Sequence, residues 1–139
     1  VVIDLGSISG LSNRLTDRRW TSTMTTWCCD QADELMIISR SDPLGLHRLH
    51  QVIELIQQTS IRASLSFVMN MKIAGKRGDM AESKFLSSVT PLKPIRIRSI
   101  ASDPRAISAA IEENATLYEI NERSSMRKSI AGLASELKS

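Results

Sequence analysis

Residues 32–70 have the sequence ADELMIISRSDPLGLHRLHQVIELIQQTSIRASLSFVMN, and two short apolar runs in it are separated by a helical pattern. The run at residues 34–38 is typical of a buried strand. Asp42-Pro43 then predicts a helix start, because the carboxylate accepts from free backbone N–H groups and proline loses no needed donor at the first helical position. The apolar face of this helix consists of Leu46, Leu49, Val52, Ile53 and Ile56. With the second run at residues 65–69, the stretch predicts a βαβ unit with parallel strands.

The remaining chain repeats this pattern on both sides. Further strands are expected at residues 1–5 and 94–97, and further helices at residues 14–28, 81–88, 103–114 and 124–137. Residues 71–80, which contain Gly75-Lys76-Arg77-Gly78, are expected to form a basic loop. We therefore predict an α/β fold: a three-layer sandwich with a mainly parallel sheet of about four strands and helices on both faces, in a single domain spanning residues 1–139.

Composition narrows the classes of partner. Only 4% of the residues are aromatic, and the basic residues behind the net charge of +3 are spread along the chain, so a nucleic-acid partner is not expected. No apolar run approaches the roughly 20 residues of a membrane span. The two cysteines, Cys28 and Cys29, are neighbours and cannot easily bridge each other, which indicates a reducing, cytoplasmic setting.

Asp4 is the first candidate site residue. It lies near the end of the predicted strand at residues 1–5, and ligands of parallel α/β sheets gather at the carboxyl ends of strands. There it could hold Mg²⁺ through water or orient an attacking water. The alternative is that Asp4 caps the following turn, and the local sequence alone favours that alternative.

Several segments, in order, resemble MinD/ParA-type ATPases of the deviant-Walker branch of P-loop NTPases. The nearest groups are the CpaE/TadZ-like pilus and secretion localisation proteins and the actinobacterial septum-site relatives. Val1–Gly6 is similar to the strand that ends in the family's switch aspartate, and residues 32–46 resemble its next strand and helix. Phe67–Asn70 resembles the strand whose terminal asparagine contacts adenine, and Pro94–Ile97 followed by Asp103 resembles the segment that closes over the base. Residues 114–119 are similar to the segment that follows.

This resemblance implies a partial SIMIBI-type P-loop NTPase fold and a nucleotide-dependent dimeric switch. Such a switch positions cell-division, pilus or secretion machinery, so its partners are proteins of that localisation or secretion machinery. Asp4 would be the catalytic residue and an indirect Mg²⁺ ligand through water. Asn70, Pro94 and Asp103 would bind the cofactor, which is ATP with Mg²⁺ in the complete protein.

The chain departs from the family at the phosphate-binding loop, which belongs upstream of Val1. Gly75-Lys76 is no substitute, because position 70 is Asn where the motif needs Gly and Arg77 stands where Ser or Thr is required. We therefore expect this chain to be the C-terminal part of a MinD/ParA-like ATPase domain, either a fragment or a degenerate form, that binds no nucleotide alone. The alternative is a non-catalytic scaffold or partner-binding module of the same fold.

Family topology also predicts an incomplete sheet. The strand of the phosphate loop normally lies between the strands that correspond to residues 1–5 and 35–38, so its absence would leave edges unpaired. We expect a homodimer or a missing N-terminal half to fill that position, with the helix bearing Trp20, Met24 and Trp27 near the contact. The alternative is that residues 1–5 pair directly with residues 35–38. Arg123, Arg127 and Lys128 raise membrane docking of the last helix as an alternative, but its apolar face is what packing on a sheet requires.

Overall fold

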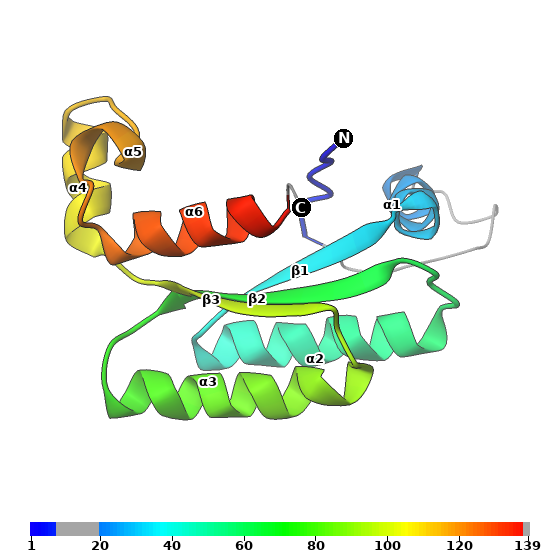
Figure 1. The fold of residues 1–139 in the computed structure, drawn as a ribbon. Helices are drawn as coiled ribbons and strands as arrows, with labels where there is room; N and C mark the ends of the chain where they lie inside the picture. Colours follow the sequence, from blue (N-terminus) through cyan, green and yellow to red (C-terminus); the bar gives the residue numbers. More distant parts are fainter. Residues whose placement is uncertain (8–19, 138–139) are drawn as a thin grey trace.

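The computed structural model describes residues 1–7 and 20–137 (Figure 1). In chain order its elements are α1 (Trp20–Gln31), β1 (Glu34–Arg40), α2 (Pro43–Gln58), β2 (Ser64–Lys72), α3 (Lys76–Val89), the 3-10 turn η1 (Thr90–Leu92), β3 (Arg96–Ala101), α4 (Pro104–Glu112), α5 (Leu117–Ile120) and α6 (Ser125–Glu136). Strands alternate with helices throughout the central part of the chain, as the sequence predicts.

The sheet has three parallel strands in the order β1-β2-β3. Leu35 of β1 pairs with Leu65 of β2, and Phe67 of β2 pairs with Ile97 of β3. The central strand β2 is buried most completely, and Phe67, Val68 and Met69 have no exposed surface. Strands with both faces covered are continuous apolar runs, and β2 is one. The βαβ unit predicted within residues 32–70 is confirmed, with β2 continuing to Lys72.

Helices cover both faces of the sheet (Figure 1). Helices α2 and α3 lie on one face, where Leu49, Ile53 and Phe85 pack against Leu35, Ile37 and other side chains of β1 and β2. Helix α6 lies on the other face, where Met126 and Leu133 contact Val68 and Ile100. The side chains of β1 divide between these faces, because successive strand residues point in opposite directions. The α/β class and the helix–sheet–helix layering are confirmed.

Side-chain caps start three of the helices at the expected residues. Asp42 accepts a hydrogen bond from the Gly45 amide at 2.8 Å, and Asp103 accepts one from the Ala106 amide at 3.1 Å. Each is followed by proline at the first helical position. Ser124 caps α6 by accepting from the Arg127 amide at 3.3 Å. The capping residues thus fix where α2, α4 and α6 leave the sheet.

The predicted strand at residues 1–5 is wrong, so the described sheet has three strands rather than about four. Residues 1–7 form no helix or strand; Val1, Val2 and Ile3 are exposed, and Leu5 packs partly against the core. An apolar run becomes a strand only when another strand pairs with it, and that pairing is a long-range contact that local pattern does not specify.

The boundaries of two other elements also differ from the prediction. The sequence predicts a loop at residues 76–80, but these residues form the start of α3, which begins after Gly75 at φ 83°. Strand β3 begins two residues later than predicted and runs on to Ala101. The helix over residues 14–28 can be judged only from residue 20 onward, where α1 continues to Gln31.

Gly78 lets the start of α3 lie close to Ile73 in the connection that follows β2. A Cβ atom there would lie 1.8 Å from the backbone oxygen of Ile73, whereas one on Gly132 of α6 would meet nothing within 4 Å. Gly78→Ala should lower the free energy of unfolding by about 1–3 kcal/mol through overpacking. Gly132→Ala should raise it by about 0.5–1 kcal/mol, because alanine restricts the unfolded chain. Urea unfolding of both variants measures the two changes, and equal effects would contradict the prediction.

Candidate functional site at the edges of the sheet

The carboxyl ends of all three strands meet at one edge of the sheet. The Ser41 amide donates to the Asn70 carbonyl at 3.0 Å, and the Ser41 hydroxyl donates to the Met71 carbonyl at 2.7 Å. The Ser102 amide donates to the Lys72 carbonyl at 2.8 Å. The structure therefore brings two of the predicted site residues, Asn70 and Asp103, to this same carboxyl edge.

Asn70 is half-buried there, and half of its amide group is already used. Its Oδ1 accepts from the Met71 amide at 2.8 Å, which holds Met71 in a left-handed conformation at φ 60°. Its Nδ2 has no hydrogen-bond partner within the described part of the chain. The two N–H donors of Nδ2 thus remain for a ligand.

The carboxylate of Asp103 is already engaged in hydrogen bonds within the chain. Its carboxylate accepts hydrogen bonds from the Ser124 side chain and from the Ala106 amide, and these hold the pKa of Asp103 below its ordinary value. This pair of contacts ties the start of α4 to the start of α6. Asp103 serves helix capping, the role that an Asp-Pro pair predicts.

Asp4 and Pro94 lie elsewhere. Asp4 is exposed in the segment before residue 8 and accepts from the Gly6 amide at 2.8 Å, which is the turn-capping alternative rather than a position at a strand end. Pro94 precedes β3, and the next residue, Ile95, donates its amide to the Leu65 carbonyl near the start of β2 at 2.8 Å. Pro94 therefore lies at the amino edge of the sheet, opposite Asn70. The four predicted residues do not form one cluster.

Basic side chains at the carboxyl edge are paired within the chain. Lys72, at the end of β2, forms ion pairs with Glu82 and, at 3.5 Å, with Asp79 of α3. Glu82 also accepts from the Ser99 hydroxyl at 2.6 Å, and the hydrogen bonds from Lys72 and Ser99 lower the pKa of Glu82. At the end of β1, Arg40 pairs with Asp42 at 2.6 Å. An anionic ligand at this edge would compete with these carboxylates.

A second feature is the outer edge of β1, which no described residue pairs with. The carbonyl of Asp33 and the amide of Ser41 both bond to β2. Because backbone groups alternate in direction along a strand, the odd-numbered residues face β2 and the even-numbered ones face outward. The outward groups are the N–H and C=O of Glu34, Met36, Ile38 and Arg40. We call them the β1 edge.

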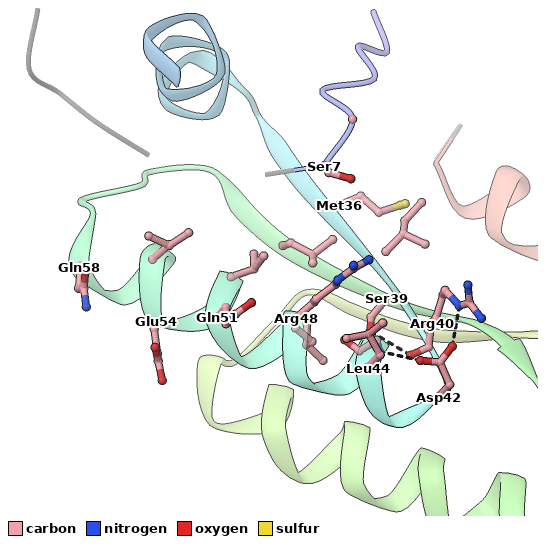
Figure 2. Close-up of a pocket in the computed structure, with 17 residues that line it drawn as sticks. Ser7, Met36, Ser39, Arg40, Asp42, Leu44, Arg48, Gln51, Glu54 and Gln58 are labelled. Carbon is pink, nitrogen blue, oxygen red and sulfur yellow. Dashed lines mark hydrogen bonds and ion pairs between the residues drawn. The ribbon is translucent and has the colours of Figure 1, made fainter. Parts of the chain in front are cut away.

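An open groove of about 1190 Å³ runs along the β1 edge, between β1, helix α2 and residues 6–7 (Figure 2). Its strand side carries Met36 and Ile38, and Ile38 is 61% exposed. Its helix side carries Leu44, Val52 and Leu55 together with the charged Arg48 and Glu54. Figure 2 shows Arg48 extending from α2 toward β1. The groove thus combines an unpaired backbone with apolar and charged side chains.

The resemblance predicts an unpaired strand at residues 35–38, but the sequence alone does not single out Arg40 or Arg48. No protein-family model matches this chain, and a search of curated proteins also finds no match for it. Across residues 1–7 and 20–137, no three His, Cys, Asp or Glu side chains gather where they could bind a metal ion. Within the same residues, no helix has the length and apolar character needed to cross a membrane.

The Lys72–Glu82–Ser99 contacts predict a pH-dependent contribution to stability. Because the pKa of Glu82 is lowered on folding, its contribution is present above its unfolded pKa, near 4.5, and is lost as the pH falls through the folded value. Glu82→Gln should lower the free energy of unfolding by about 0.5–1.5 kcal/mol at pH 7. The difference in free energy of unfolding between Glu82→Gln and the wild type should shrink toward pH 3. The control Glu122→Gln changes an exposed side chain and should match the wild type at every pH. Urea unfolding across this range measures both, and a constant gap would contradict the prediction.

Proposed function

We propose that this chain is a non-catalytic assembly module that binds a β-strand of another protein chain along the β1 edge. The observation that carries the proposal is the unpaired β1 edge beside the exposed side chain of Ile38. A bound strand would satisfy the outward backbone groups by main-chain hydrogen bonds and would bury the apolar side chains of the groove. This is the scaffold alternative among the functions that the sequence suggests.

The two edges of the sheet differ in how they are protected. Proteins protect exposed edges with proline, lysine, bulges or short strands. Glu34–Arg40 has no proline or lysine, and its register with β2 is regular over all seven residues. At the other edge, Pro94 precedes β3, the register of β3 with β2 shifts near its end, and Arg98 is held by Glu136 of α6 at 2.7 Å. The difference supports β1 as the side that pairs.

The proposal extends to the cellular setting. Cys28 and Cys29 are both free thiols, and Cys29 is buried, which raises its pKa. A buried neutral thiol is an inert apolar group in a core. We place the module in the reducing cytoplasm, where such thiols persist.

The substitution Ile38→Pro tests the proposal. The Ile38 N–H faces outward, so proline removes a donor to the bound strand and no hydrogen bond to β2. Ile38→Pro should leave the circular dichroism spectrum unchanged and abolish assembly. Native mass spectrometry of the purified chain should show an additional bound chain on the wild type and on the Ile38→Val control, but none on Ile38→Pro. Equal mass distributions for the three proteins would contradict the proposal.

A second candidate function is the nucleotide-dependent switch implied by the MinD/ParA resemblance. The observation that favours it is the Nδ2 group of Asn70, which no described residue contacts by a hydrogen bond. It lies at the carboxyl edge, where parallel α/β sheets bind ligands. In that function Asn70 contacts adenine, ATP and Mg²⁺ are the cofactors, and the partners belong to localisation or secretion machinery. The phosphates would require residues outside this sequence.

Binding of an ATP analogue by a longer form of the protein separates the two functions, and Asn70→Ala tests the role of Asn70. If a longer form of the protein binds an ATP analogue, this substitution should weaken binding by about 1–3 kcal/mol, because a buried polar group of the base would lose its partner. Calorimetric titration measures the change, with Ser102→Ala as a neighbouring control. Unchanged affinity would remove Asn70 from the nucleotide site.

A further inference from the structure

We infer that the chain bound at the β1 edge is a second copy of this protein, with its own β1 antiparallel to the first around a two-fold axis at Ile37. The inference rests on the proposed assembly function and names its partner. It follows from the direction of the backbone groups of β1 and from the order of side chains along Glu34–Arg40.

The backbone permits this pairing. In an antiparallel pair, two opposed residues exchange both hydrogen bonds only when the backbone groups of both point toward the partner strand. The outward residues of β1 all have even numbers, so an even-numbered residue of one copy must stand opposite an even-numbered residue of the other. The numbers of two opposed residues therefore add up to an even number. An axis at Ile37 gives a sum of 74, which opposes Glu34 to Arg40 and Met36 to Ile38. Every outward N–H and C=O of β1 then has a partner.

The side chains select the same register. Each end of the pair places Glu34 of one copy opposite Arg40 of the other, and the middle places Met36 opposite Ile38 on the face toward α6. Opposite charges and apolar pairs in directly opposed positions stabilise antiparallel strands. Glu34 already contacts Arg96, and Arg40 contacts Asp42, so the new pairs would extend existing ion pairs. A shift by two residues opposes Glu34 to Ile38 or Arg40 to Met36 and leaves end residues unpaired.

Helix α2 lies beside the strand and would meet its own copy across the same two-fold axis. Ser39 near the end of β1 donates to the carbonyl of Gly45 near the start of α2 at 3.1 Å. Because a seven-residue strand and a sixteen-residue helix have similar lengths, the helix runs back along the whole strand. Arg48 and Glu54 lie three positions on either side of Gln51, and all three line the groove. The two-fold axis that pairs the strands brings the two copies of α2 together in antiparallel order. Figure 2 shows Arg48 directed toward β1 and Glu54 directed away from it, so the charge complementarity of this register rests on Glu34 and Arg40.

Complementary charge variants test the partner and the register together. Arg40→Glu alone would oppose Glu34 to glutamate at both ends of its dimer, and Glu34→Lys alone would oppose Arg40 to lysine. Each should weaken self-association by about tenfold or more. An equimolar mixture should form a heterodimer of wild-type affinity, because each end then joins opposite charges. Sedimentation velocity gives the affinities, and native mass spectrometry identifies the mixed species.

Glu34→Lys removes a partner of Arg96, so thermal melts must check that this variant is folded. Disulfide crosslinking then tests the register in proteins that keep Glu34. Met36→Cys mixed with Ile38→Cys should give an intermolecular disulfide between positions 36 and 38, since this register opposes them. A monomeric wild type, a mixture that does not form the heterodimer, or a crosslink at other positions would overturn the inference. If the wild type binds a different protein and Ile38→Pro does not, the inference that the partner is a second copy is wrong. The proposed assembly function would still hold. A segment of the same chain on the β1 edge would keep the wild type monomeric.

Discussion

Backbone hydrogen bonding in a three-stranded sheet is the constraint on which this structure depends. Only β2 has strands on both sides, and β1 and β3 each present one row of backbone groups that no described residue pairs with. Burying such groups unpaired is costly, so each edge needs protection or a partner. The chain treats its two edges differently, and this difference guides the functional interpretation.

At the carboxyl edge, polar groups serve the connections between elements. Asp42 and Asp103 cap helices, Glu82 joins β2, β3 and α3 through Lys72 and Ser99, and Ser41 bridges β1 to β2. This edge is where α/β proteins usually bind ligands, yet these carboxylates here are engaged with their own chain. Asn70 is the exception, because the two N–H donors of its Nδ2 have no partner among residues 1–7 and 20–137.

Local signals predicted the central elements, and long-range pairing accounts for the main error. Asp42-Pro43 and Asp103-Pro104 placed two helices correctly because capping acts within three residues. Val1–Leu5 has the composition of a strand, but whether it pairs depends on a neighbour that its own residues do not specify. The resemblance suggested one site from Asp4, Asn70, Pro94 and Asp103, but Pro94 precedes its strand and so lies at the opposite edge from Asn70. The alternation of backbone direction along β1 became interpretable only when its bonds to β2 were known.

Because the backbone direction alternates along β1, its odd-numbered residues stabilise the fold and its even-numbered residues face a partner. Leu35, Ile37 and Ser39 point into the layer with α2 and α3, and the backbone groups of the same residues bond to β2, so they carry the fold. The even-numbered residues direct their backbone outward, and Ile38 and Arg40 are exposed, so they can meet a partner without disturbing the core. Because Glu34 and Arg40 stand equally far from Ile37 with opposite charges, the outward series is complementary to its own reverse. A strand with this symmetry favours its own copy over an unrelated strand, since an unrelated sequence would have to match charge, apolar centre and register at once.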